Sequence, residues 1–445
     1  MPKTTLRASL LSLAMAGLWA SVSPTAHAQS LVELYESARA YDTTYRSARL
    51  QFEASQARAE QAKANVLPTA GVSAGASVTN LDVLSANTSR TFPTQSATLS
   101  ASQPLYRPAN WALNEQGQKQ LELARAQLDG AEQELIVRTS QAYFDVLASQ
   151  DSLTFVKAQK AAVAEQLASA RRNFEVGTAT ITDTREAQAR FDLVSAQEIA
   201  AENDLRVKKI ALDQLVGKTD AQPRALLTPV ALPPVQPADV STWVQLAEAA
   251  HPSIRQAQSN VEIARLEVTR AEAGHKPTLD LTASYVAANN PKGSANTVAA
   301  SRSNSAAVGL SFNLPLFAGF ATQNRIRETL ALSERASSDL DGARRTIAQN
   351  TRTAFFGVVS GQSQVKALEA AELSSQSALD ANRLGYQVGV RINIDVLNSQ
   401  SQLFQTKRDL ARARYDVLVG GLRLRQASGT LSPQDLQAIN ALLAP

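Results

Sequence analysis

Two stretches of the sequence place hydrogen-bonding side chains in the same pattern. "FEVGTATITDTREAQ" covers residues 174–188, and "YQVGVRINIDVLNSQ" covers residues 386–400, which is 212 positions later. In each stretch a glycine is followed by an aspartate, Asp183 or Asp395, where a new helix would start. A carboxylate at that place can accept hydrogen bonds from the unpaired N–H groups of a helix N-terminus. The chemistry that these residues offer is therefore hydrogen bonding rather than covalent catalysis.

Taken alone, the spacing favours helix capping. Asp183 is followed three residues later by Glu186, which fits a capping box, and Asp395 is also placed to cap a helix. Gly177 and Gly389 are predicted to end the preceding helices, because glycine adopts the left-handed conformation that commonly terminates a helix. A role in gating a pathway is the alternative for the polar residues.

No set of residues in the sequence predicts catalysis. The chain has three histidines and no cysteine. His27 lies in an N-terminal segment that we expect to be removed, and His251 and His275 stand near prolines at helix ends, where we expect a structural role. No cluster of carboxylates completes a metal site around them, and the nucleotide-binding and nucleophile motifs are missing. We therefore predict that the protein is not an enzyme and holds no cofactor or metal.

The first residues have the pattern of a secretory signal peptide. Lys3 and Arg7 precede an apolar run over residues 10–22, and small residues lead to a predicted cleavage after Ala28. The mature protein is thus expected to work outside the cytoplasm. Without cysteine, we expect neither a disulfide nor a lipid anchor. The 44 basic and 40 acidic residues nearly balance, so that we expect no binding to nucleic acid.

The chain is predicted to be a duplicated unit. The turn described above recurs at an offset of 212, and "QPLY" at 103–106 matches "LPLF" at 314–317. Each repeat is expected to contain a helix, two strands and a long helical hairpin. The predicted division is a signal peptide over 1–28, a first repeat over 29–216, a Pro-rich equatorial linker over 217–240 and a second repeat over 241–445.

The helical segments are predicted to be unusually long. From about residue 108 to residue 176, apolar residues recur at the alternating three- and four-residue spacing of a coiled-coil seam. A continuous helix of about 65 residues would extend about 100 Å. The second repeat has the same pattern. Aromatic residues make up only 5% of the chain, so that we expect these helices to pack in a thin layer.

Four segments alternate between apolar and polar residues, as strands with two different faces do. Their apolar positions are Val72, Ala74, Ala76 and Val78; Ala97, Leu99 and Ala101; Leu279, Leu281, Ala283 and Tyr285; and Val308, Leu310, Phe312, Leu314 and Leu316. The polar faces carry small side chains, which suit the wall of a water-filled lumen. Lipid does not tolerate an open sheet edge, and four strands cannot close a barrel. We therefore expect several chains to donate four strands each; a soluble sheet covered by helices is the alternative.

The sequence resembles the TolC family of outer-membrane channel proteins. The resemblance rests on "YQVGVRINIDVLNSQ", on the following "RDLARARYDVLVGGLRLRQASGTLSPQDL" and on the doubled order of strands and long helix, and it extends over the mature chain. It implies an α+β membrane protein that forms a homotrimer. Each chain would give four strands to one twelve-stranded β-barrel, and a long α-helical coiled-coil barrel would continue it.

The resemblance also implies a function in export. The protein would lie in the lipid of the outer membrane, extend into the periplasm and serve as the exit duct for proteins or for small toxic compounds. Its partners would be a periplasmic adaptor protein and an inner-membrane pump of the ABC or RND type. A periplasmic coiled-coil structural or adaptor protein without a channel is the alternative.

By the same resemblance, the repeated turn forms the periplasmic entrance of the channel. An entrance latch would join one helix pair to the other through Thr182, Asp183, Tyr386 and Arg391. Asp395 matches an aspartate of the family's constriction ring. A second aspartate is expected three residues later, where this chain has Asn398. One ring of carboxylates in place of two weakens the expectation of strong cation selectivity.

Overall fold

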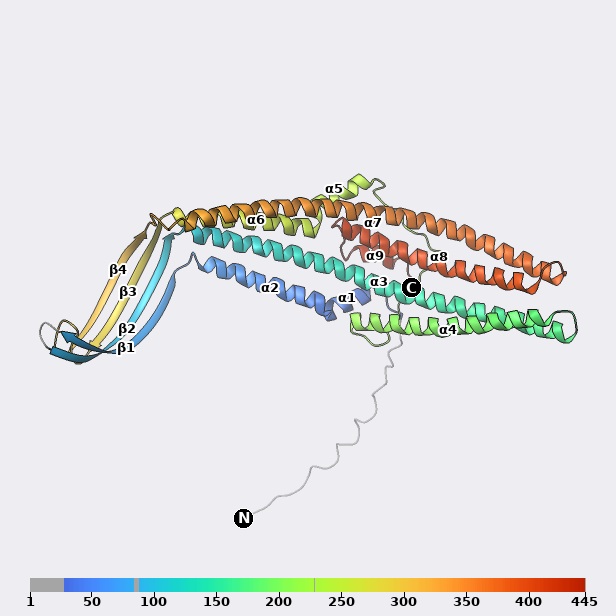
Figure 1. Cartoon of the computed structure of the whole chain (residues 1–445), viewed down its shortest axis with the longest axis horizontal. Helices are drawn as coiled ribbons and strands as arrows, with labels where there is room; N and C mark the ends of the chain where they lie inside the picture. Colours follow the sequence, from blue (N-terminus) through green and yellow to red (C-terminus); the bar gives the residue numbers. More distant parts are fainter. Residues whose placement is uncertain (1–27, 84–87, 228, 445) are drawn as a thin grey trace, which may run out of the picture.

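The computed structural model describes residues 28–83, 88–227 and 229–444 of the chain. The predicted signal peptide lies, apart from Ala28, outside the described residues. The molecule is elongated, with a sheet at one end and helices that run from the sheet to two turns at the opposite end (Figure 1). The two turns that carry the predicted entrance residues are therefore brought together far from the sheet.

Two helices precede the strands in each half of the chain, where the sequence predicted one. They are α1 (Leu31–Tyr41) and α2 (Thr43–Ala64), and α5 (Val240–Ala250) and α6 (Pro252–Glu272). The breaks come at Asp42 and His251, whose side chains cap the second helix of each pair. Asp42 Oδ1 accepts a hydrogen bond from the Tyr45 N–H at 2.7 Å, and His251 Nδ1 accepts one from the Ser253 N–H at 3.1 Å. His251 thus has a structural role.

The strands form one antiparallel sheet in the order β1-β2-β3-β4. They are β1 (Thr69–Val83), β2 (Thr88–Tyr106), β3 (Thr278–Asn290) and β4 (Ser301–Asn313). The register places Val72 opposite Leu99, and Leu99 opposite Tyr285. Because side chains alternate along a strand, this register brings the predicted apolar positions of neighbouring strands to one face of the sheet.

The ends of the strands differ from the prediction. The first hairpin is longer than its apolar alternation indicated, since β1 extends to Val83 and β2 begins at Thr88. By contrast, β4 ends at Asn313, so that Leu314 and Leu316 lie beyond the strand. Pro315 stands between these two leucines and has no N–H to donate to a neighbouring strand, which stops the ladder there.

In the described part of the chain, no helix covers either face of the sheet (Figure 1). Val72, Val308 and Phe312 are 78%, 77% and 65% exposed, so that the apolar face is open. Among the described residues, the outer strands β1 and β4 each have one edge without a partner strand. An open apolar face and two open edges indicate that something outside this chain covers them.

The predicted long helices are confirmed. Helix α3 (Pro108–Glu175) has 68 residues and α7 (Ala321–Gln387) has 67. Each is followed after a turn by a shorter antiparallel helix, α4 (Ile181–Val216) or α8 (Asn393–Ala427). At 1.5 Å per residue, α3 is about 100 Å long. Helix α3 packs against both α4 and α8 and so joins the two hairpins. The buried seam between the three helices includes Val163, Ala170, Ala187, Val194 and Leu397.

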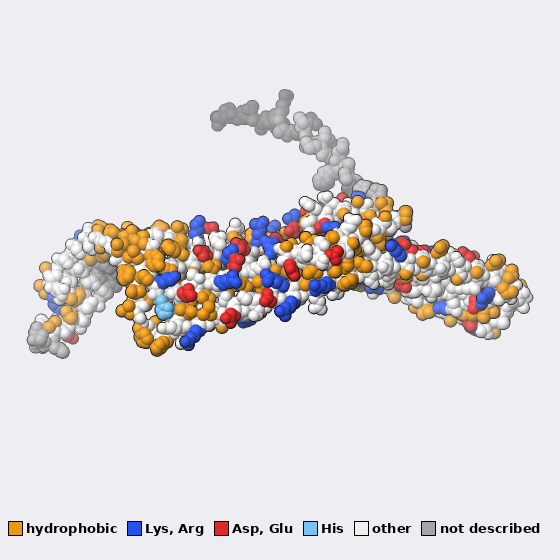
Figure 2. Space-filling view, turned by 90° about the horizontal axis from the view of Figure 1, so that it is seen from above, with side chains coloured by type: hydrophobic (Ala, Val, Ile, Leu, Met, Phe, Trp, Pro, Cys, Tyr) orange, Lys and Arg blue, Asp and Glu red, His pale blue; other side chains and the backbone are white. Residues whose placement is uncertain are grey.

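The largest cluster of buried apolar side chains lies where α1, the Pro-rich linker and α9 (Asp435–Asn440) pack against the middle of α3 and the C-terminal half of α8. Tyr35, Tyr143, Phe144 and Leu436 are almost completely buried there. The hydroxyl of Tyr143 donates to the carbonyl of Arg224 in the linker at 2.9 Å. Figure 2 shows charged side chains along the helical body and few on the sheet. Among the helices of the described residues, none is both long and apolar enough to cross a membrane.

Candidate functional site

Both long helices end in the same hydrogen-bonded turn. Gly177 and Gly389 have φ angles of 78° and 81°, in the left-handed region that glycine adopts without steric cost. After α3, the N–H of Thr178 donates to the carbonyl of Asn173 at 2.8 Å, and the equivalent bond after α7 measures 2.9 Å. These bonds define a Schellman motif. The two copies thus share a backbone, and their differences lie in their side chains.

The first turn leads into a capped helix. Thr180 is the N-cap of α4, which begins at Ile181. The Thr180 N–H donates to Asp183 Oδ2 at 2.9 Å, and the Asp183 N–H donates to Thr180 Oγ1 at 3.2 Å. The predicted capping box of Asp183 with Glu186 is wrong, because α4 starts before Asp183 and places it at the third helical position. Asp183 Oδ1 has no hydrogen-bond partner among the described residues.

The second turn leads into a helix without a side-chain cap. Helix α8 begins at Asn393 after Ile392, whose side chain has no acceptor atom. The interpretation of Asp395 as a cap is wrong, because it is the third residue of the helix. Its Oδ2 lies 3.8 Å from Nη1 of Arg391, four residues earlier. Both side chains are partly exposed, so that this pair contributes little stability.

Tyr386 contacts the other helix pair, although not through Asp183. Its ring packs against the cluster that contains Leu379 and Val396. Its hydroxyl accepts a hydrogen bond from Nδ2 of Asn173, near the end of α3, at 3.4 Å. A link between the two hairpins therefore starts from the predicted tyrosine but reaches a different partner.

The structure does not bring the four predicted latch residues together within one chain. Among the described residues, no hydrogen bond or ion pair joins any two of them. Thr182 is exposed, Asp183 is bonded within its own turn, and Arg391 is loosely paired with Asp395. The latch therefore stays a prediction. The free oxygen of Asp183 and the exposed Arg391 leave both groups available to a neighbouring chain.

Two contacts between the helix pairs involve residues that the sequence analysis missed. Asn393 accepts a hydrogen bond from Gln166 Nε2 at 2.5 Å and donates to the backbone carbonyl of Asp183 at 3.2 Å. Arg190 Nη2 donates to Asn398 Oδ1 at 2.8 Å. Asn398, at the place of an expected ring carboxylate, is thus bonded to a cation, which lowers the negative charge at this level further.

Gly385 makes room for Arg391. Gly385 is buried at the end of α7, and a Cβ built there would lie 2.7 Å from Cγ of Arg391. The equivalent positions in the first repeat hold Asn173 and Ala179. The pairing of a glycine with an arginine is therefore particular to the second copy, and it lets the stem of the arginine lie against the helix end.

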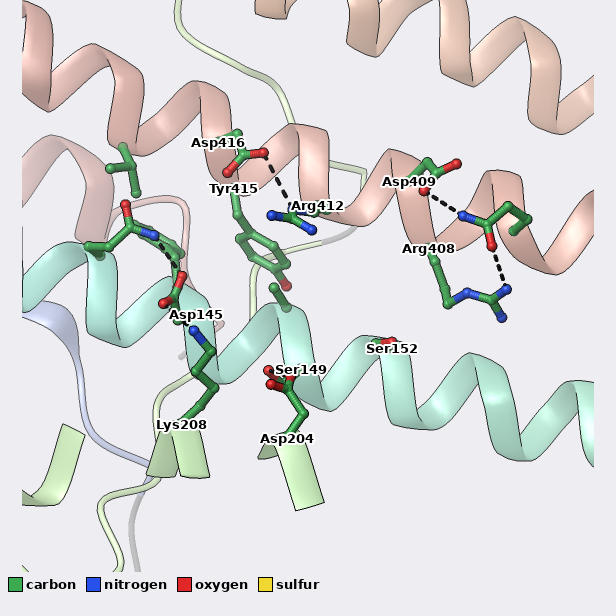
Figure 3. A pocket seen from close by; sticks show the side chains of 15 residues that line it. Asp145, Ser149, Ser152, Asp204, Lys208, Arg408, Asp409, Arg412, Tyr415 and Asp416 are labelled. Atoms are coloured by element: carbon green, nitrogen blue, oxygen red, sulfur yellow. Dashed lines mark hydrogen bonds and ion pairs between the residues drawn. The ribbon is translucent and has the colours of Figure 1, made fainter. Parts of the chain in front are cut away.

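A polar cavity of about 500 Å³ lies between α3, α4 and α8, farther from the turns (Figure 3). Lys208 Nζ lies 2.9 Å from Asp145 Oδ2, and the Tyr415 hydroxyl donates to Asp151 Oδ2 at 2.7 Å. Burial raises the pKa of Asp151 and that of Tyr415. No group of metal-ligating side chains is found among the described residues. The Lys208–Asp145 pair joins α4 to α3, and the Tyr415–Asp151 bond joins α8 to α3, so that polar contacts hold the three helices together around this cavity.

Comparison with known proteins agrees with this geometry. The family model for outer membrane efflux proteins matches residues 34–218 and 243–430, once in each half of the chain. The chain belongs to this family. TolC of Vibrio cholerae is 32% identical over 432 residues, which cover 97% of this chain and 98% of the relative. The protease secretion protein PrtF of Dickeya chrysanthemi is 30% identical over 435 residues, which cover 94% and 92%.

Solved structures of a transmembrane channel protein and of an outer-membrane protein have the same fold. CusC superposes with a TM-score of 0.79 at 18% identity, covering 90% of this chain and 92% of that chain. VceC of Vibrio cholerae superposes with a TM-score of 0.78 at 20% identity, covering 90% and 96%. The resemblance to the TolC family and the predicted repeat of strands and long helices are confirmed.

Membership of the outer membrane efflux protein family locates the chain in the outer membrane, with its helices extending into the periplasm. This confirms the predicted location. The family consists of transport proteins and not of enzymes. The repeated turns therefore belong to an export channel.

Proposed function

We propose that three copies of this chain form one duct, which passes cargo from a pump in the inner membrane to the outside of the cell. The observation that carries the proposal is the four-stranded sheet with an uncovered apolar face and two open edges. Around a ring, β4 of one copy lies antiparallel to β1 of the next, so that every edge gains a partner. Three copies of four strands give twelve, enough to close a membrane barrel.

The barrel gives each surface of the sheet a suitable environment. Its apolar face, with Val72, Val308 and Phe312, would meet the lipid of the outer membrane. Its other face carries small polar residues such as Ser73 and Thr282 and would line a water-filled lumen. The long helices of the three copies would continue this lumen through the periplasm to the turns.

We propose a periplasmic adaptor protein and an inner-membrane pump of the ABC or RND type as partners. Relatives support this assembly: PrtF and AprF of Pseudomonas aeruginosa are described as protease secretion proteins, and BepC of Brucella suis is described as an efflux protein. A duct without a nucleotide-binding motif needs a partner to supply energy. Both proteins and small toxic compounds are candidate cargo.

The entrance latch is proposed to act between neighbouring chains. In the described part of the chain Asp183 Oδ1 has no hydrogen-bond partner, and the Arg391 side chain is 59% exposed. Both lie at the turns, where three chains of a ring converge. A charge-assisted hydrogen bond between an arginine and a carboxylate of the next chain would hold the entrance closed. Thr182 and Tyr386 would add hydroxyl contacts, and three copies of Asp395 would form the constriction ring.

Bilayer recording on the purified protein tests the proposal. The expected result is a heat-modifiable trimer in outer-membrane fractions that gives single-channel steps in planar bilayers. A soluble monomer without conductance would support the periplasmic coiled-coil alternative instead.

The kind of cargo is tested by deletion in the source organism. Loss of a secreted protein from the medium would assign the duct to secretion, and increased sensitivity to drugs or solvents would assign it to efflux. Loss of both would show that one duct serves two pumps.

A further inference from the structure

Asn393 is a fully buried amide at the first position of α8, with an exposed fraction of 0%. Its Oδ1 accepts a hydrogen bond from Nε2 of Gln166 on α3 at 2.5 Å. Its Nδ2 donates to the backbone carbonyl of Asp183 on α4 at 3.2 Å. One side chain therefore joins three helices and connects the two copies of the turn.

The amide occupies a place where the packing calls for an apolar side chain. Val396, Leu397 and Leu403 follow on the same helix and are buried in the seams. In the first repeat, the equivalent residue 212 positions earlier is Ile181, which is 48% exposed. The backbone of the turn is the same in both copies, so the turn itself does not require an amide. A buried amide is costly unless both of its polar groups are hydrogen-bonded, as they are here.

We propose that Asn393 is a positioning residue that holds the two helical hairpins together at the channel entrance. Movement of the α7–α8 hairpin away from the α3–α4 hairpin breaks both of its hydrogen bonds. Asn393 thus stabilises the closed arrangement within each chain, and contacts between chains such as the latch would add to this stabilisation. The inference rests on the proposed function, in which these turns form the entrance.

The chemistry of this contact differs from that of the charged latch. An amide, a second amide and a carbonyl carry no net charge, so that acid does not titrate their hydrogen bonds and salt does not screen them. By contrast, acid and high salt should both weaken the proposed pair of Asp183 and Arg391 between chains. A closed state that persists in high salt is therefore expected from Asn393 and not from the charged pair.

The Asn393→Leu variant of the full-length trimer removes both hydrogen bonds and places an apolar side chain of similar size in the seam. One ordinary hydrogen bond corresponds to about a fivefold change in an equilibrium. Two such bonds in each of three chains that open together should therefore shift the ratio of open to closed channels by about ten-thousandfold. Single-channel recording in planar bilayers should show this shift as a larger open fraction.

The Asn393→Asp variant separates positioning from simple packing. At neutral pH its carboxylate still accepts from Gln166 but repels the carbonyl of Asp183, so the channel should open as in the leucine variant. At acid pH the added proton restores a donor, and the open fraction should return toward that of the unaltered protein. A residue that merely fills space would not produce this reversal.

The Tyr415→Phe variant is the matched control. Tyr415, which is labelled in Figure 3, is also buried, and it also joins α8 to α3 through its hydrogen bond to Asp151. Asp151 is 15 residues before Gln166 on α3, about 22 Å away along the helix. Removal of this hydroxyl should lower stability without changing the open fraction.

Trypsin cleavage at Arg391 supplies a readout that does not depend on conduction. The Asn393→Leu trimer should be cut faster than the unaltered and Tyr415→Phe trimers. An unchanged open fraction and an unchanged cleavage rate would overturn the proposal for Asn393, as would equal effects in the control. If no variant conducts while cleavage at Arg391 is still faster in Asn393→Leu, the proposed channel function fails and the positioning role stands.

Discussion

The hydrogen bond between Arg190 and Asn398 leads to a quantitative prediction about ion selectivity. The two residues lie on α4 and α8, 208 positions apart, with Nη2 and Oδ1 separated by 2.8 Å. Arg190→Gln removes a positive charge at this point, and Asn398→Asp adds a negative charge within a few ångströms of it. Because the two changes act at one place, they should shift the selectivity for cations over anions by about the same amount.

The expected shift follows from Coulomb's law with screening. At about 8 Å in water and physiological salt, a unit charge changes the energy of a passing ion by about 0.2 kcal/mol. Three chains together change this energy by about 0.6 kcal/mol. The permeability for a cation then rises by a factor of about 2.6, and that for an anion falls by the same factor. The permeability ratio should therefore rise about sevenfold for either single variant, and about fiftyfold for both together.

Reversal potentials in a KCl gradient across a planar bilayer measure this ratio directly. Arg325→Gln is the control, because Arg325 lies near the start of α7 and pairs with Glu267, far from the turns. The reasoning is refuted if Asn398→Asp changes the reversal potential and Arg190→Gln does not. That result would mean that Arg190 is not at the pathway wall beside Asn398.

Three further outcomes are expected. Tyr386→Phe combined with Arg391→Ser should raise single-channel conductance in bilayers by removing the tyrosine's and arginine's latch contacts, and unchanged conductance would count against the latch. Gly389→Ala and Gly177→Ala should each lower the free energy of unfolding by about 1 kcal/mol. No atom lies within 4 Å of a new Cβ at either position, so that only the positive φ opposes the alanine. A loss above about 3 kcal/mol in thermal unfolding would contradict this. Burial lowers the pKa of His251 below its ordinary value of 6.5 in the folded protein. As the pH falls below about 6.5, the unfolded chain gains a proton that the folded chain does not, and the protein therefore loses stability until the pH reaches the lower folded pKa. Unfolding curves at a series of pH values should show this loss, and His251→Asn should flatten it.

Much of the fold was predictable because its signals are periodic. The seam spacing extends over most of α3, and a helix places residues at this spacing along one face. The alternation around Val72 and Leu281 likewise predicted strands with two different faces. The ends of the elements were less predictable. Capping hydrogen bonds decided some of them, as at Asp42, where a side-chain cap starts a second helix.

The candidate site was predictable only in part. The glycine turns could be recognised because the motif repeats, but the start of α4 was placed three residues too late, which made Asp183 seem to be the cap in place of Thr180. A signal for Asn393 was present in the sequence, as a polar residue in line with Val396, Leu397 and Leu403. It was not recognised because a seam position near a helix end looks like a surface position until the neighbouring helix is placed.

The sequence by itself determined the duplication, the long helices, the four amphipathic strands and the family of this protein. These properties follow from local periodicity and from the order of residues along the chain, and both can be read without coordinates. Only the tertiary structure decided which polar groups meet at the turns. Gln166, Arg190 and Asn393 come from three helices, and their pairing depends on how two hairpins lie against each other. Such contacts join residues about 200 positions apart, and no local pattern in the sequence encodes them.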